Sequence, residues 1–569
     1  MDSFLIGKKV NKIADSNFYI RENNNEKIQY KEFNMKPKEK LYFNGEILTL
    51  EDDGLYVEAV LLKGDKIEKL GKKEELLQAA DENVELIDLQ GKTLMPSFID
   101  AHSHFSGYAI SFTQADLKDV VNFAGIAEAI KNFIEKNNIA SGKWVQADGY
   151  DHNFLDEKTH PTRELLDSAA PNNPVIAKHK SGHMGVLNTM GLKELGITVD
   201  TPNPEGGTIE KKNGELTGYL EETAFINYVQ SLPMVSKEEF MESLIKAQNA
   251  YASYGITTVQ EGFVGVQLAH LFQYLTQLNH LKIDVIGFLD IFQADELKRM
   301  FANSIKKYDN HVKIGGYKIF LDGSPQGRTA WMRTPYVGDQ SDYYGYGTQK
   351  DSELEVALEL ALNDNMQILA HCNGDAACEQ YINQYEIAKE KTSSENDIRP
   401  VIIHAQLLDR DQLDRVEALN MIPSFFLAHI YHWGDIHIQN FGQERASRIS
   451  LANSTGEKGI LYTLHQDAPV IEPNMLETIW CAVNRITKEG TVLGEDEKIS
   501  PLDAIKAVTK NVAYQYFEEE LKGTIKEGKF ADLVILDQNI LKVQPMEIKD
   551  IRVLETIKEG ETIFLNTTP

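Results

Sequence analysis

Short apolar segments alternate with amphipathic helical segments through most of this 569-residue chain. Eight segments are predicted as β-strands: TLMPSFIDAHSH, GITTVQEGF, KIDVIGFLD, VKIGGYKIFLDG, MQILAHC, PVIIHA, MIPSFFLAH and GILYTLHQD. Helical stretches such as DSELEVALELALND and DQLDRVEALN lie between them. Because strands that alternate with helices favour a parallel sheet, the pattern predicts an α/β fold, and eight such units indicate a (β/α)8 TIM barrel.

The length of the chain requires more than a simple barrel. The barrel region is predicted at about 96–519, well beyond the ~250 residues typical of that fold. Most of the surplus follows the first strand, so we expect a large insertion at about 108–245, over the barrel mouth. Short alternating segments with glycine turns at 39–95 and 520–569 predict a small composite β domain built from both chain ends. Residues 1–38, rich in lysine and asparagine, are expected to be a polar extension.

The amino-acid composition restricts which binding partners and which cellular compartment we expect. The formal net charge of −28 argues against nucleic-acid and anionic-membrane partners, because both require concentrated positive charge. We find neither a signal-peptide pattern nor an apolar run long enough to span a bilayer. Three cysteines cannot form a disulfide framework in so long a chain, so we expect a reducing cytoplasm. The expected partner is a small-molecule substrate, and assembly as a homodimer is left open.

Polar residues with metal-binding side chains follow several of the predicted strands. They are His102 and His104 after the first strand, Lys318 in the fourth, His371 in the fifth, His404 in the sixth and Asp467 after the eighth. In an extended chain residues i and i+2 point to the same face, so the two imidazoles of the first strand can converge. Barrel active sites form at the carboxyl ends of the strands, where all six side chains would meet. Imidazole and carboxylate groups are metal ligands, and the set therefore predicts a metal site.

Each of these residues also has an ordinary structural interpretation. A lysine at a strand end usually extends into solvent, and a single buried histidine is usually a hydrogen-bonded core residue. Asp467 could be a helix N-cap. His183, in SGHMG, could hydrogen-bond substrate from the insertion or stabilise its loop. The remaining histidines considered are expected to support the site or to lie on the surface: His152, His160, His179, His429, His432 and His465.

The arrangement resembles the amidohydrolase superfamily over nearly all of the chain from about residue 39. The matching motifs are FIDAHSH, IIHAQ, HQDAPV and the closing GTIKEGKFADLVILD. Within the superfamily the chain looks most like the branch, amidohydrolase family 3, that includes N-substituted formamide deformylase. That branch pattern is found in GHMGVLN, GGTIEKKNGELTGYLEE, YKIFLDGS and HCNGDAA. One position departs from it, because Gln466 precedes Asp467 where a serine is expected.

The resemblance implies a site for two metals. It places His102, His104 and Asp467 on the first metal, His371 and His404 on the second, and Lys318, carboxylated by carbon dioxide, between the two. Only a neutral amine captures carbon dioxide, and burial beside cations lowers the pKa of a lysine, so the chemistry supports this reading. Zinc is the first choice for imidazole and oxygen ligands, with manganese, iron or nickel as alternatives.

The resemblance also implies hydrolysis of a C–N bond in an amide, an N-substituted formamide or a cyclic amide. Two divalent cations lower the pKa of a shared water from ~15.7 to about 7, so that hydroxide can attack a carbonyl. Asp467 and His183 are the expected catalytic residues, with Asp467 transferring the proton. An ester or lactone substrate, a non-catalytic binding barrel, and an isomerase or decarboxylase on the same site remain as alternatives.

Overall fold

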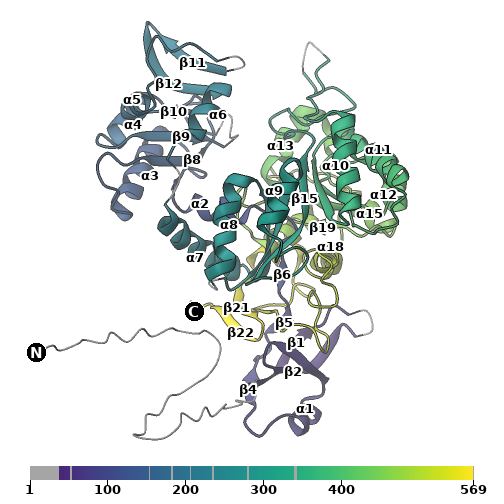
Figure 1. Ribbon diagram of the computed structural model, residues 1–569. Helices are drawn as coiled ribbons and strands as arrows, with labels where there is room; N and C mark the ends of the chain where they lie inside the picture. The colour runs from purple at the N-terminus through teal and green to yellow at the C-terminus, as the bar shows by residue number, and fades with distance from the viewer. Residues whose placement is uncertain are drawn as a thin grey trace, which may run out of the picture.

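The computed structural model describes residues 38–567, except 52–53, 153, 181–183, 205–206, 234–235, 279–280 and 339–341. The predicted N-terminal extension, apart from residue 38, and His183 therefore lie outside the described residues. Three β-sheets organise the described chain: one forms the barrel, one joins segments from the two chain ends, and one lies between the first two barrel strands in sequence (Figure 1).

The barrel sheet contains eight strands that pair in the order in which they occur in the chain. They are β6 (Phe98–Ile99), β13 (Ile256–Val264), β14 (Asp284–Asp290), β15 (Val312–Phe320), β16 (Gln367–Cys372), β17 (Val401–His404), β18 (Ile422–Phe425) and β19 (Thr463–Leu464). Every neighbouring pair is parallel. Each of the eight predicted segments overlaps one of these strands, and the expected α/β fold with a TIM-barrel-like parallel sheet is confirmed.

Helices follow most barrel strands and pack their apolar sides on the sheet. On α10 (Asp351–Asn363) the residues at intervals of three and four are buried: Leu354, Ala357, Leu358, Ala361 and Leu362. The other helices of this region are α2 (Phe105–Ser111), α7 (Lys237–Ser253), α8 (Val266–Leu278), α9 (Ala294–Met300), α11 (Asp375–Thr392), α12 (Leu413–Ala418), α13 (His429–Phe441), α14 (Gln443–Ala446), α15 (Ala452–Glu457), α16 (Met475–Asn484), α17 (Pro501–Ala507) and α18 (Lys510–Gln515). Short 3-10 turns occur at Ile291–Gln293, Arg410–Gln412, Glu495–Glu497 and Pro545–Asp550. Among the described helices, none combines the length and the apolar character needed to cross a membrane.

The second sheet joins strands from both ends of the chain and lies at the bottom of Figure 1. Its strands are β1 (Glu39–Leu48), β2 (Tyr56–Lys63), β3 (Lys66–Gly71), β4 (Glu85–Asp88), β5 (Thr93–Pro96), β20 (Leu533–Leu536), β21 (Val553–Lys558) and β22 (Glu561–Leu565), with α1 (Lys73–Ala79) beside them. The segment TLMPSFIDAHSH was predicted as one strand, but the structure divides it. β5 pairs with β20 of this sheet, whereas β6 pairs with β13 of the barrel. The break lies at Ser97, whose backbone N–H donates to the carbonyl of Asp532.

The third sheet lies between β6 and β13 in the chain and appears at the upper left of Figure 1. It consists of β7 (Ala115–Asp116), β8 (Val145–Tyr150), β9 (Val175–His179), β10 (Met184–Leu187), β11 (Gly207–Lys212) and β12 (Glu215–Glu222), with helices α3 (Phe123–Lys136), α4 (Arg163–Ala169), α5 (Thr189–Glu194) and α6 (Thr223–Gln230). Two side chains of this region reach the barrel. Lys118 Nζ donates to the carbonyl of Pro469 at 2.7 Å, and Lys180 Nζ lies 4.9 Å from the centroid of the Trp433 ring.

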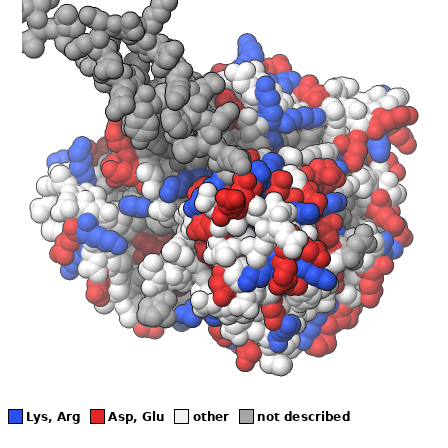
Figure 2. Space-filling model, turned by 90° about the horizontal axis from the view of Figure 1, so that it is seen from below, with Lys and Arg blue, Asp and Glu red and all other residues white. Residues whose placement is uncertain are grey.

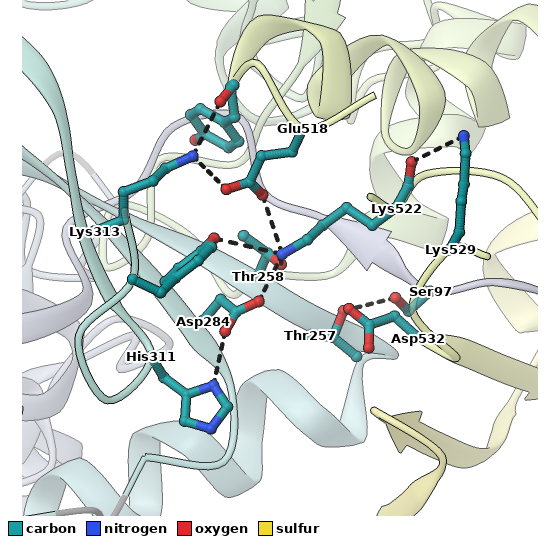
Figure 3. Close-up of polar contacts among 12 residues, drawn as sticks. Ser97, Thr257, Thr258, Asp284, His311, Lys313, Glu518, Lys522, Lys529 and Asp532 are labelled. Atoms are coloured by element: carbon teal, nitrogen blue, oxygen red, sulfur yellow. Dashed lines mark hydrogen bonds and ion pairs between the residues drawn. The ribbon is translucent and has the colours of Figure 1, made fainter. Parts of the chain in front are cut away.

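Buried charges join the barrel to the C-terminal segment (Figure 3). Lys522 Nζ lies 2.6 Å from an Asp284 carboxylate oxygen and 3.0 Å from a Glu518 oxygen. Lys558 Nζ approaches the same Asp284 oxygen at 2.9 Å, and Lys313 forms an ion pair with Glu518. On the face of the molecule in Figure 2, by contrast, acidic and basic side chains are interspersed over the surface.

Candidate metal centre

The predicted ligand residues lie at the carboxyl ends of the barrel strands. His102 and His104 follow β6, and Asp467 follows β19. Lys318 and His371 lie in the last part of β15 and β16, and His404 is the last residue of β17. Because all these strands are parallel, their carboxyl ends share one edge of the sheet. The structure thus brings residues separated by more than 360 positions to one mouth of the barrel.

Asp467 faces three of the predicted histidines. Its Oδ1 lies 3.5 Å from Nε2 of His102 and 3.6 Å from Nε2 of His104, and its Oδ2 lies 3.8 Å from Nε2 of His404. Oδ1 of Asp467 is buried without a hydrogen-bond partner among the described atoms. Buried carboxylate oxygens are normally satisfied, so a group of facing donor atoms with one unsatisfied oxygen fits a divalent cation.

Two of the candidate ligands have strained backbone conformations. His404 has φ of 71° and Asp467 has φ of 56°, a left-handed region that non-glycine residues rarely adopt. Each such residue costs about 1–3 kcal/mol, and strain of this kind clusters at functional sites. The Asp467 loop is fixed by backbone contacts: its N–H donates to the carbonyl of His102 at 3.2 Å, while the N–H of His104 donates to the carbonyl of Ala468 at 2.8 Å.

Lys318 lies inside the same cluster and is fully buried. Its Nζ is 3.3 Å from Nε2 of His102. Burial lowers the pKa of the Lys318 amine, although the carboxylate of Asp467 opposes that shift. The environment therefore favours the neutral amine, which is the form that can react with carbon dioxide.

The histidines are held in the form that binds metals. Burial lowers the pKa of His104 to about 3, and burial also lowers the pKa of His102 and His404 well below the ordinary range for histidine. All three imidazoles are consequently neutral at pH 7 and offer a nitrogen lone pair. The donor set of neutral imidazoles, a carboxylate and a buried amine fits the chemistry of a divalent metal centre.

Two further side chains, Gln260 and Asp322, orient the imidazoles of His102 and His371 respectively. His102 Nδ1 lies 2.5 Å from Oε1 of Gln260, and Gln260 Nε2 donates to the carbonyl of Ala101 at 2.8 Å, which fixes the amide. The Nδ1–H of His102 therefore donates to Gln260, and Nε2 is left toward Asp467. His371 Nδ1 lies 3.2 Å from Oδ1 of Asp322. Partners of this kind set the tautomer and the ring direction of metal-binding histidines.

Sequence reasoning gave no role to Gln260 or Asp322, although both lie in predicted strands or in quoted motifs. His465 was expected to support the site or to lie on the surface, and the structure places it in the buried interior. Its Nε2 is 3.1 Å from Nδ1 of His404, and its Nδ1 is 2.9 Å from Oγ of Ser424. Gln466, the position that departs from the family pattern, turns toward the following loop, where its Nε2 donates to the carbonyl of Asn474 at 2.6 Å.

A second acid lies at the edge of the cluster. Glu261, in β13, has Oε1 at 4.0 Å from Nδ1 of His104 and accepts a hydrogen bond from the backbone N–H of Ser106 at 2.7 Å. Burial raises the pKa of Glu261 to about 7. Its only sequence signal was its position near the carboxyl end of the second predicted strand.

Two other groups of described residues have metal-ligand side chains close together. Asp284, His311 and Glu559 form one of them. Asp284 is the first residue of β14 and His311 directly precedes β15, so this group lies at the amino ends of the strands, opposite the mouth. The ammonium groups of Lys522 and Lys558 lie within 3.0 Å of Asp284 and already neutralise it. Because a cation would be repelled by these lysines, we do not assign a metal to that group. Asp151, His152 and His179 form the other.

A TIM-barrel-like fold with imidazole and carboxylate groups gathered at the carboxyl ends of its strands defines a metal-binding barrel protein. A family model described as the amidohydrolase family matches residues 85–564. The chain therefore belongs to the amidohydrolase family, and the resemblance inferred from its motifs is confirmed.

Individual relatives match over nearly their full length. The chain is 28% identical over 538 residues to YtcJ of Bacillus subtilis (strain 168), with 92% of this chain and 99% of that protein covered. It is 26% identical over 548 residues to N-substituted formamide deformylase of Arthrobacter pascens, with 92% and 98% covered. Among solved structures, an uncharacterized metal-dependent hydrolase from Pyrococcus furiosus superimposes with a TM-score of 0.72 at 24% identity, covering 89% of this chain and 100% of that one.

Proposed function

We propose that the chain is a metal-dependent hydrolase that cleaves a C–N bond in an amide, an N-substituted formamide or a cyclic amide. The observation that carries the proposal is the approach of His102, His104 and His404 to the single carboxylate of Asp467, beside the buried amine of Lys318. The similarity to N-substituted formamide deformylase supports the choice of a C–N bond.

The proposal includes two divalent cations, with zinc as the first candidate, and the group formed by His102, His104 and Asp467 supports the first of them. His102, His104 and Asp467 would hold one, His371 and His404 the other, and carboxylated Lys318 would bridge them. When bound, two such cations lower the pKa of a water at the site from ~15.7 to about 7 and polarise a substrate carbonyl.

Lys318 must first become a ligand. Its neutral amine nitrogen attacks the carbon of carbon dioxide and releases one proton, which leaves a carbamate with two oxygen ligand atoms. The burial of Lys318 favours the neutral amine that this reaction requires. A protonated ammonium has no lone pair and could neither react nor coordinate.

Asp467 has a second role in the proposal, because breaking a C–N bond requires a proton on the leaving nitrogen. Its carboxylate would accept a proton from the attacking water and then donate it to that nitrogen. The 3.5–3.6 Å distances from Oδ1 to His102 and His104 place this carboxylate at the centre of the cluster. His183 would hydrogen-bond substrate or serve as an alternative acid.

The test combines metal analysis with a substrate panel. Protein grown with zinc and bicarbonate should contain about two more metal ions per chain than Lys318→Ala, and it should hydrolyse at least one compound among N-formyl amines, N-acyl amines and cyclic amides. In ¹⁸O-labelled water the carboxylate product should gain one labelled oxygen. A product without label would indicate an isomerase or decarboxylase. Metal-loaded protein that cleaves neither the C–N panel nor matched esters would support a non-catalytic binding barrel.

A further inference from the structure

A second group of histidines lies outside the barrel, where two strands of the third sheet end side by side. β8 and β9 are parallel neighbours, and their register pairs Tyr150 with His179. Asp151 and His152 directly follow β8, so they emerge next to the last residue of β9. The topology therefore repeats on a small scale what the barrel does: polar side chains gather at the carboxyl ends of adjacent parallel strands.

The side-chain atoms of this group face one another at short distances. His152 Nδ1 lies 3.1 Å from His179 Nε2, His179 Nε2 lies 3.5 Å from Asp151 Oδ1, and His152 Nδ1 lies 4.0 Å from the same oxygen. Zinc binds imidazole nitrogen and carboxylate oxygen at about 2.0–2.2 Å, so ligand atoms around a tetrahedral ion lie roughly 3.3–3.6 Å apart. The observed separations bracket that range.

A third imidazole, that of His160, lies against the group. The ring centroid of His160 is 4.2 Å from that of His152 and 5.8 Å from that of His179. The hydroxyl of Tyr150, a fully buried side chain, lies 2.9 Å from Nδ1 of His160. Nδ1 of His160 is thus held by a buried partner, and the tautomer in which Nδ1–H donates to the Tyr150 oxygen gives Nε2 the lone pair that a metal ligand requires.

We propose that Asp151, His152 and His179 bind a divalent transition-metal ion, with zinc as the best match, and that His160 is the candidate fourth ligand. This site is separate from the barrel centre, since its ligands come from β8, β9 and the loop after β8. The three atoms already lie at distances a metal can bridge, and both nitrogen and oxygen donors are present.

The position of the site suggests what the ion does. Lys180 directly follows His179, and its ammonium lies over the ring of Trp433 on α13 of the barrel. Lys118 of the same region donates to the carbonyl of Pro469, two residues after Asp467. An ion that ties the end of β8 to the end of β9 would fix the segment through which the third sheet contacts the barrel mouth. We therefore assign it a structural role.

The test counts metal ions in variants of the full chain. Zinc-loaded, dialysed protein is compared with His152→Ala and with the matched control His270→Ala, which removes an exposed histidine of α8. We expect His152→Ala to lose about one ion per chain and His270→Ala to lose none. Equal metal content in His152→Ala and wild type would overturn the proposal.

The barrel site is distinguished by Lys318→Ala, which should remove barrel ions and keep the ion bound by His152. If that variant retains its full metal content, the proposed barrel centre is refuted. The β8–β9 site is then still tested separately, by the metal content of His152→Ala. Should His152→Ala not fold, crystals of the zinc-loaded wild type decide the question. Anomalous scattering at the zinc edge should give a peak between Asp151, His152 and His179, and its absence there would overturn the assignment.

Discussion

The carboxylate of Asp322 lies 3.2 Å from Nδ1 of His371. The backbone N–H groups of Asn373 and Gly374 donate to the two oxygens of Asp322 at 3.0 Å and 2.7 Å, so the carboxylate cannot rotate freely. A fixed acceptor at Nδ1 selects the tautomer in which Nε2 is unprotonated. In the proposed metal centre, Asp322 would therefore orient His371 as a ligand and would not itself bind the ion.

Replacing Asp322 by asparagine should weaken metal binding. The amide retains one acceptor oxygen, but it cannot accept the backbone hydrogen bonds on both sides and also orient His371. Losing a partner of this kind typically costs 10–100-fold in metal affinity or activity. Zinc affinity measured by competition with a chelator should fall by that factor in Asp322→Asn. The exposed control Asp295→Asn, on α9, should match wild type, and an unchanged affinity in Asp322→Asn would refute the orienting role.

Lys318→Ala should lose the metal ions of the barrel centre and nearly all turnover, because no carbamate can form without the amine. Formate, acetate or propionate added to the variant should restore part of both, since a small carboxylate can supply the missing oxygens. Metal content and rate are measured together as the acid concentration rises. If the folded variant shows no recovery at any concentration, carboxylation of Lys318 is the wrong explanation.

The fold was largely predictable because hydrophobic periodicity is a local property of the sequence. Each strand of the barrel carries its own apolar run, and α10 carries its own buried stripe. The predicted boundary between the composite domain and the barrel, at residues 95 and 96, falls inside TLMPSFIDAHSH. The partner that fixes the break, the carbonyl of Asp532, lies far along the chain and could not be identified from the sequence pattern.

The candidate site, like the fold, could be predicted from the sequence only in part. His102, His104 and Asp467 could be identified as candidate ligands because imidazole and carboxylate groups commonly bind metals, and because the predicted strands place these residues at the carboxyl end of the barrel. Gln260 and Asp322 could not be assigned a role, since an amide or carboxylate becomes an orienting group only through a partner, here 158 and 49 residues away respectively. Distances between side chains of distant strands are not present in the sequence pattern.

The buried charges at the base of the barrel predict a stability effect. Lys522 is almost fully buried between Asp284 and Glu518. Removing one member of a buried ion pair costs about 3–5 kcal/mol when its partner is left unpaired. Here Lys558 still pairs with Asp284 and Lys313 still pairs with Glu518, so we expect the low end of that range, about 3 kcal/mol. Lys522→Met should therefore lower the free energy of unfolding by that amount in a denaturant titration. Lys526→Met, which changes an exposed neighbour, should have little effect, and equal stabilities of the two variants would contradict the assignment.

The same network predicts acid sensitivity. Burial alone would raise the pKa of the Asp284 carboxyl, but Lys522 and Lys558 together hold this pKa well below the ordinary value of 3.8. A depressed pKa in the folded state stabilises the protein above the unfolded pKa, and this stabilisation is lost as the pH falls below it. The melting temperature of wild type should thus fall between pH 5 and pH 3. Asp284→Asn should show a weaker decline, and parallel curves would exclude Asp284 as the source.

Asp467→Asn separates metal binding from proton transfer. The asparagine amide keeps an oxygen that can coordinate a cation, but it cannot accept a proton at neutral pH. If the carboxylate transfers the proton, the variant should keep most of its metal while turnover falls by ~10²–10⁴-fold, the range for losing a general acid–base group.

If Asp467 serves only as a ligand, metal content and turnover should fall together, and added zinc should recover both. Substrates with leaving groups of different basicity sharpen the distinction. A leaving nitrogen that departs without protonation needs no acid, so Asp467→Asn should lose much less activity toward activated anilides than toward alkyl amides. A leaving oxygen of low basicity should behave like the anilides. A metal-loaded variant that loses the same factor with every leaving group would show that Asp467 does not donate the proton, and His183 would be the next residue to replace.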